Sequence, residues 1–127
     1  MKLNSVLTLL FIALFTACKG GAYDLSGYGL KPDTGENASP LIAKALQEIA
    51  AEVNSDTVRI LLPKGRYDFY PEGASKREYF ISNHDQDNPK TVGFPLEDWK
   101  GLTVDGQGAD FIFHGRMLPL SLLRSED

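Results

Sequence analysis

Apolar residues recur at intervals of three and four positions between residues 42 and 53, which is the period of one face of an α-helix. They are Ile42, Ala45, Leu46, Ile49, Ala50 and Val53. Ser39 is the expected N-cap, and Pro40, whose missing N–H costs nothing at a helix start, is the expected first helical residue. The opposite face is polar, so the pattern predicts an amphipathic helix that covers an apolar surface.

From Thr57 onward the pattern changes to short apolar runs separated by Gly, Pro, Asn and Asp, which predicts β-strands. The expected strands are 58–62, 67–70, 79–82, 102–104, 111–113 and 120–123, and alternation predicts another at 23–30. Leu102 and Leu122 stand 20 residues apart, near the length of one coil of a parallel β-solenoid. An antiparallel sandwich with an appended helix would give similar runs, so periodicity alone leaves both folds open.

The order of the elements favours the solenoid. A strand, a loop over 31–37 and one helix precede the other strands, and stacked coils need a cap over their exposed apolar end. We therefore expect a mainly β fold, namely the N-terminal coils of a right-handed parallel β-helix with one N-terminal capping α-helix. The apolar run 118–123 has no second cap after it, so we expect an incomplete domain that begins a longer protein.

The N-terminal segment combines Lys2 with an apolar run from Val6 to Phe15. Such a run is shorter than the roughly 20 apolar residues that span a bilayer, which indicates a removable signal peptide. It ends in Phe15-Thr16-Ala17-Cys18 and resembles a bacterial lipoprotein signal. We expect removal of residues 1–17, lipidation of Cys18, a tether over 18–22 and a β-helix domain from residue 23 to 127. Phe15 stands where such signals usually have Leu, so ordinary cleavage near Ala17 is the alternative. The expected location is the outer membrane, with its side undetermined.

Charge and cysteine content exclude several classes of protein. Without residues 1–17, 12 basic residues face 17 acidic ones, a net charge of −5. The basic residues are spread singly among acids, so nucleic-acid binding is not expected. Cys18 is the only cysteine, which excludes an intramolecular disulfide. His84 and His114, the only histidines, lack partners at the spacing of a zinc motif, so neither a metal nor another cofactor is expected.

Candidate binding residues are few. The polar loop 82–89 contains His84 and Asp85 and either binds sugar hydroxyls or simply turns the chain. His114 and Arg116 are the other candidates for substrate binding. Gly106-Gln107-Gly108 lacks the third glycine of a dinucleotide-binding loop and predicts a tight turn.

Aromatic and acidic residues suggest further chemistry by composition. The aromatic residues of 66–70 either stack on a sugar or pack in a half-buried strand, and packing is favoured. Asp85 with Asp87, or Glu97 with Asp98, would suit the acid and base of an inverting glycosidase, which lie about 6.5–9.5 Å apart. Solvated turns explain these carboxylates equally well.

A family resemblance begins at Pro63-Lys64-Gly65-Arg66-Tyr67-Asp68-Phe69. With the preceding Asp33-Thr34-Gly35 loop and the predicted helix, this turn resembles the first coils of pectate-lyase-like right-handed β-helix enzymes. Further segments narrow the resemblance to the Bacteroides-type α-1,3-galactosidases, glycoside hydrolase family 110, over residues 23–127. These segments are 81–86, 95–99, 102–108 and 113–119.

The resemblance implies that the parent protein is a metal-independent, inverting exo-enzyme. It would release terminal α-1,3-linked galactose from glycans, including blood-group-B structures. Family members are several times longer, with catalytic carboxylates in later coils that would lie beyond Asp127. No catalytic residue is therefore assigned here, and this chain alone is expected to be inactive. Two alternatives stay open: a non-catalytic surface module that binds glycans, and a polysaccharide lyase of the same superfamily.

Overall fold

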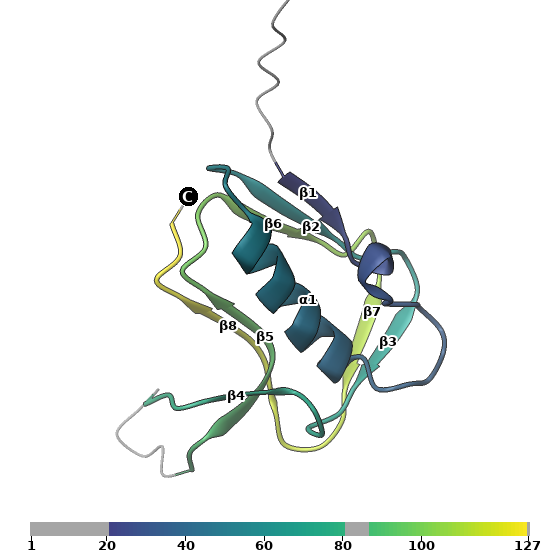
Figure 1. Cartoon of the computed structure of the whole chain (residues 1–127). Helices are drawn as coiled ribbons and strands as arrows, with labels where there is room; N and C mark the ends of the chain where they lie inside the picture. Colours follow the sequence, from purple (N-terminus) through teal and green to yellow (C-terminus); the bar gives the residue numbers. More distant parts are fainter. Residues whose placement is uncertain (1–20, 81–86, 127) are drawn as a thin grey trace, which may run out of the picture.

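The computed structural model describes residues 21–80 and 87–126. The predicted signal peptide, Cys18, His84 and Asp85 lie outside the described residues. Within the described ranges the chain forms one α-helix, α1 (Ser39–Glu52), one short 3-10 helix, η1 (Leu25–Tyr28), and eight strands (Figure 1). The strands are β1 (Gly21–Asp24), β2 (Val58–Leu61), β3 (Arg66–Phe69), β4 (Ser75–Arg77), β5 (Lys90–Glu97), β6 (Leu102–Asp105), β7 (Asp110–Phe113) and β8 (Leu118–Leu123). The prediction of a mainly β chain with one N-terminal helix is confirmed.

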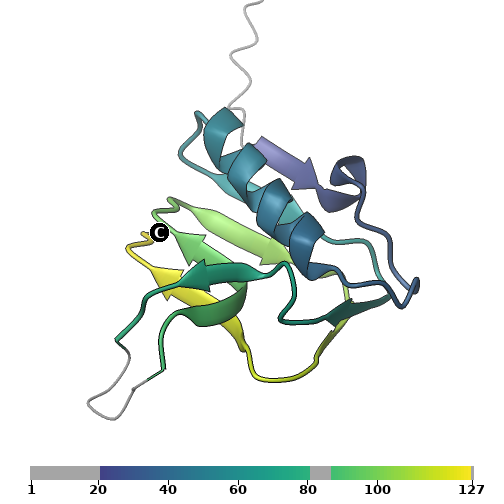
Figure 2. The same cartoon turned by 60° about the horizontal axis from the view of Figure 1, so that its bottom comes forward.

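The strands form three small sheets, in which three strands of one turn of the chain each pair with a strand of the next turn. β6, β7 and β8 lie parallel to β2, β3 and β5, respectively. β1 adds a further parallel strand beside β2, and β4 pairs antiparallel with the start of β5. Residues 58–97 and 102–123 therefore make two stacked turns, with the helix α1 on the side of the first turn, away from β8 (Figure 2).

The register of these pairs shows that the 20 residues between Leu102 and Leu122 are not the length of one turn. Leu102 pairs with Val58, 44 residues earlier, whereas Leu122 pairs with Leu96, 26 residues earlier. Leu102 and Leu122 thus belong to different sheets of the same turn. The first turn is longer because the arm that contains β4 is inserted between β3 and β5.

The core lies between α1 and the inward faces of the two turns. Ile42, Ala45, Leu46 and Ile49 of α1 are buried, as the apolar pattern predicts, whereas Ala50 is exposed. At the centre, Phe69 stacks on Phe113 with ring centroids 4.7 Å apart. Tyr67 and Phe69 are 2% and 0% exposed, so the packing interpretation is confirmed for these two aromatic residues, whereas Tyr70 is half-buried.

The helix start differs from the prediction by one residue. Ala38 holds the cap position without a side-chain hydrogen bond, and Ser39 is already helical. The Ser39 hydroxyl instead donates to the Tyr70 carbonyl at 2.7 Å. Asn37 Oδ1 accepts from the backbone N–H groups of Ser39 and Tyr70, at 3.0 and 3.1 Å. Asn37 and Ser39 therefore join the start of the helix to the end of β3, and this tertiary contact overrides the local capping preference.

Two of the predicted strands also need correction. The expected strand 23–30 ends at Asp24, because Asp24 Oδ1 accepts from the Ser26 N–H at 2.9 Å and turns the chain into η1. Residues 78–80 are not in a strand, and the rest of the expected strand 79–82 lies outside the described residues. β4 and β5 were not predicted.

Among the helices of the described part of the chain, none is long and apolar enough to cross a membrane.

Candidate functional site

A polar cluster lies on the outward face of the β3–β7 pair. Alternation along β3 turns Tyr67 and Phe69 into the core, so Arg66 and Asp68 face outward. The next outward position after β7 is His114, whose N–H donates to the Phe69 carbonyl at 2.8 Å. Parallel pairing of β3 with β7 thereby brings His114 beside Asp68.

Asp68 is the centre of this cluster, with only 7% of its side chain exposed. Its Oδ2 and Oδ1 accept from Arg66 Nε and Nη2 at 3.1 and 2.8 Å, and its Oδ1 lies 2.7 Å from His114 Nε2. Hydrogen bonds from Arg66 first, and from His114 second, lower the pKa of Asp68 to about 2. Asp68 is thus a carboxylate at neutral pH and does not suit the role of general acid.

A surface cavity of about 360 Å³ opens beside this cluster. Its walls are formed by Asp33, Gly35, Tyr70 and the three clustered side chains. Asp33 fixes the loop to β3, because its Oδ1 accepts from the Arg66 N–H at 2.9 Å and its own N–H donates to the Arg66 carbonyl at 2.8 Å. The Tyr70 and His114 rings are stacked, with centroids 4.2 Å apart and planes at 5°. The cavity combines fixed polar groups with an aromatic pair, which suits a polar ligand better than an apolar one.

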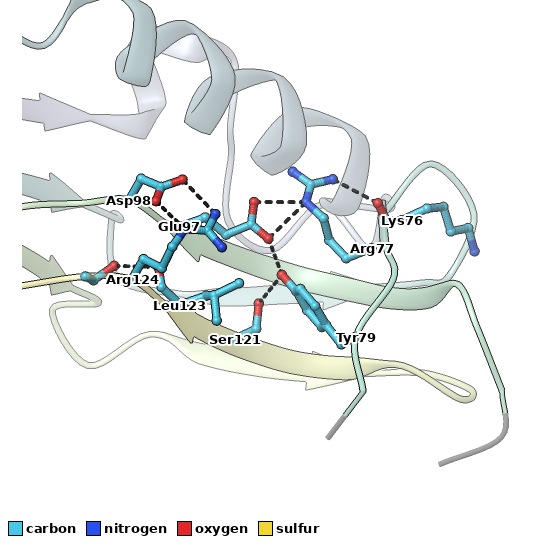
Figure 3. A network of polar contacts seen from close by, with 9 residues as sticks. Lys76, Arg77, Tyr79, Glu97, Asp98, Ser121, Leu123 and Arg124 are labelled. Atoms are coloured by element: carbon cyan, nitrogen blue, oxygen red, sulfur yellow. Dashed lines mark hydrogen bonds and ion pairs between the residues drawn. The ribbon is translucent and has the colours of Figure 1, made fainter. Parts of the chain in front are cut away.

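A second polar network surrounds Glu97 at the end of β5 (Figure 3). Arg77 Nε donates to both Glu97 oxygens at 3.1 Å, and the Tyr79 hydroxyl donates to Oε1. The Tyr79 oxygen also lies 3.1 Å from Ser121 Oγ on β8. Burial alone would raise the pKa of Glu97, but the hydrogen bonds from Tyr79 and Arg77 outweigh it and the pKa is lowered.

Asp98 belongs to a separate ion pair. Its two oxygens accept from Arg124 Nε and Nη2 at 2.6 and 2.9 Å, and the hydrogen bond from Arg124 lowers the pKa of Asp98 (Figure 3). Glu97 and Asp98 are therefore held by different arginines, and both are stabilised in the ionised form. This arrangement fits two structural carboxylates better than the acid and base of a glycosidase, because the acid must carry a proton at working pH.

The predicted binding residues are only partly brought together. His114 enters the cavity wall, whereas Arg116 lies outside it and pairs with Asp87 at 2.6 Å, with both side chains largely exposed. His84 and Asp85 lie outside the described residues. No group of potential metal ligands occurs within residues 21–80 and 87–126.

Arg66 and Asp68 were not predicted as site residues. The available signal was a charged residue between two aromatic ones, Tyr67 and Phe69, in a predicted strand. The predicted turn at Gly106-Gln107-Gly108 is confirmed, with Gln107 and Gly108 at φ 50° and 80°.

Comparison with known proteins identifies relatives of this chain, although no model of a known protein family matches it. Alpha-1,3-galactosidase B of Phocaeicola vulgatus is 65% identical over 125 residues, which are 98% of this chain and 20% of that protein. A protein of the same name from Bacteroides fragilis is 56% identical over 106 residues, 83% of this chain and 18% of that protein. Alpha-1,3-galactosidase A of Shewanella woodyi is 40% identical over 101 residues, 80% of this chain and 16% of that protein.

These matches cover most of the chain, including α1 and the strands of both turns. The chain spans about a fifth of the length of the curated relatives it matches. By sequence, the chain is therefore similar to a part of several bacterial proteins named alpha-1,3-galactosidase.

Proposed function

We propose that this chain is the N-terminal part of an exo-acting, inverting glycoside hydrolase that releases terminal α-1,3-linked galactose from glycans. Blood-group-B-type and linear α-1,3-galactosides are the proposed substrates. The observation that carries this proposal is the 65% identity over 125 residues to an α-1,3-galactosidase B. Asp68, Glu97 and Asp98 are all stabilised as carboxylates, so none of the three suits the proposed general acid, which must carry a proton at working pH.

The architecture proposed for this part is the start of a right-handed parallel β-helix capped by α1. Three parallel strand pairs in the same order along the chain support it. Leu120 and Leu122 share the inward side of their buried partners Phe94 and Leu96, yet they are 51% and 62% exposed. Such an apolar end suits the stacking of a further turn.

We also propose that the protein is exported and anchored in the outer membrane. The support is the sequence alone: the apolar run 6–15 and the following Cys18. A Cys18→Ser variant should then fail to incorporate labelled palmitate and should leave the membrane fraction, whereas the unchanged protein should incorporate the label and stay in that fraction. Equal labelling of the two proteins would overturn the lipid anchor.

The activity is tested on the product of the gene's uninterrupted reading frame and on the 127-residue chain side by side. With α-1,3-galactobiose as substrate, a product as long as the relatives is expected to release galactose as the β-anomer, and the 127-residue chain none. NMR of the first turnovers distinguishes the anomers. Unsaturated uronides formed from polygalacturonate would instead assign a lyase, and binding of galactosides without any release would assign a binding module.

A further inference from the structure

A groove runs between α1 and the strands β4 and β5, with a volume of about 550 Å³. This volume falls within the range of about 300–1,000 Å³ that small-molecule sites occupy. α1 forms one wall through Lys44 and Gln47, and Ser75 and Arg77 of β4 contribute to the opposite wall. We call this feature the α1–β5 groove. Two residues that line the groove, Arg77 and Glu97, are drawn in Figure 3, where they lie beneath α1.

Several polar groups of the groove have no partner in the described structure. The Gln47 amide and the Ser75 hydroxyl make no hydrogen bond to any described residue. Trp99 lines the same groove and is 94% buried, since its exposed fraction is 6%. Its indole N–H also has no acceptor among residues 21–80 and 87–126. Because no fully buried polar side-chain atom in those residues lacks a hydrogen-bond partner, this N–H must be accessible to solvent. These donors and acceptors are available to a ligand.

The Arg77–Glu97 pair adds fixed groups to the groove. Arg77 Nε holds the Glu97 carboxylate, and Arg77 Nη1 donates to the Lys76 carbonyl at 2.9 Å. Both side chains are therefore oriented before a ligand arrives, which reduces the entropy lost on binding. A carboxylate accepts up to about four hydrogen bonds, so Glu97 retains acceptor capacity beside the guanidinium donors of Arg77.

The charges lining the groove are balanced, with Lys44 and Arg77 against Glu97 and Asp98. A charged ligand would gain little net attraction from such a lining, whereas a neutral ligand with many hydroxyl groups matches it. Each hydroxyl both donates and accepts hydrogen bonds, so of two adjacent hydroxyls one can donate to a carboxylate while the other accepts from a guanidinium. A neutral sugar has this chemistry.

We propose that the α1–β5 groove is a binding site for a neutral hexose unit of a glycan, with Gln47, Ser75, Arg77, Glu97 and Trp99 as its hydrogen-bonding residues. The ligand class follows from the donors, acceptors and charge balance of the groove. It does not depend on the hydrolase proposed above, because binding requires no bond cleavage.

The test is an NMR titration of the ¹⁵N-labelled 127-residue chain with galactose and with α-1,3-galactobiose. Saturable shifts are expected at the Gln47 side-chain amide and the Trp99 indole N–H. Gln47→Ala and Ser75→Ala should each weaken the apparent affinity by about threefold to tenfold, the value of a single hydrogen bond. Glu52→Gln is the matched control, since Glu52 is an exposed residue of α1 outside the groove. The affinity of this variant for the sugar should be unchanged.

Three results would overturn the site. The first is the absence of saturable shifts at Gln47 and Trp99 in the parent protein when its amide spectrum is well dispersed. The second is a set of shifts gathered instead around Tyr70 and His114. The third is tighter binding of galacturonate than of galactose, which would show that the groove selects a charge. A failure here leaves galactose release by the longer product untouched, and the two proposals fail separately.

Discussion

His114 Nε2 lies 2.7 Å from Asp68 Oδ1, joining the two stacked turns on their outward face. The two residues are 46 positions apart in the chain and meet only because β7 lies parallel to β3. Arg66 holds the same carboxylate from within β3, so Asp68 receives hydrogen bonds from both turns. The cluster therefore contributes to the stability of the stack as well as to the wall of a cavity.

Asp68→Asn is expected to lower the free energy of unfolding in a pH-dependent manner. The pKa of Asp68 is about 2 in the folded chain and 3.8 ordinarily, so folding favours the ionised form. The stabilisation is complete above the ordinary value and is lost as the pH falls through the folded value. In urea unfolding at a series of pH values, the difference between parent and variant should shrink toward pH 2. Asp56→Asn, at a side chain that is 94% exposed, should show no such difference at any pH.

The sequence predicts the helix and strands whose burial is set by their own residue pattern, and it misses a strand that depends on its neighbour. The buried face of α1 and strands β2, β3, β6 and β7 follow from periodicity, because their apolar residues face one core. The apolar run of β8 also predicts its strand, although Leu120 and Leu122 are exposed. β5 does not follow from its pattern, since Gly93 and Pro95 interrupt its sequence and normally end strands. A Cβ at Gly93 would lie 2.8 Å from the Pro119 carbonyl oxygen, so β8 requires glycine there. At Pro95 only β8 pairs with β5, and a missing N–H is tolerated.

The candidate site is less predictable than the strands. His114 was a candidate by residue type, but its partner Asp68 is defined by the register between two strands. That register depends on the length of the arm between β3 and β5, which no local pattern specifies. The α1–β5 groove is equally hard to predict, because Gln47, Ser75 and Trp99 come from separate parts of the chain: α1, β4 and the segment after β5.

Tyr67→Phe should cost about 1 kcal/mol of unfolding free energy, the typical value of a buried hydrogen bond. The Tyr67 hydroxyl donates to the Pro63 carbonyl at 2.6 Å, and the residue is 2% exposed. The ring stays in the core of the variant, so only the hydrogen bond is lost. Tyr28→Phe is the control, since Tyr28 is half-buried and its hydroxyl makes no hydrogen bond within the described structure. Equal midpoints for both variants in urea would contradict the assignment.

Gly101→Ala should destabilise the chain by about 2 kcal/mol or more. Gly101 has φ 54°, and a Cβ there would lie 2.3 Å from the Asp56 carbonyl oxygen. The clash involves backbone on both sides and cannot be relieved by a rotamer change. Gly27→Ala provides the comparison, because nothing lies within 4 Å of its Cβ position. Thermal unfolding of the two variants should therefore separate clearly, and a Gly101→Ala protein as stable as the parent would show that the two turns meet differently.

Phe69→Ala should cost about 3–5 kcal/mol, the usual range for removing a buried phenylalanine ring. Phe69 is 0% exposed and contacts the rings of Phe94, Phe111 and Phe113, with centroids between 4.7 and 5.7 Å away. Because these rings come from β5 and β7, the cavity would loosen both turns together. Phe80→Ala is the control, since Phe80 is 84% exposed and its loss should leave the midpoint nearly unchanged.

If Phe69→Ala does not fold, Phe69→Leu keeps most of the apolar volume and should remain folded with a lower midpoint. Near-ultraviolet circular dichroism then reports whether the aromatic packing is lost along with stability. A Phe69→Leu protein with unchanged stability and spectrum, or a Phe80→Ala protein as destabilised as Phe69→Ala, would place the centre of the core elsewhere. Through its ring contacts with Phe94, Phe111 and Phe113, Phe69 links β3 to both β5 and β7, so its removal tests the packing of both turns.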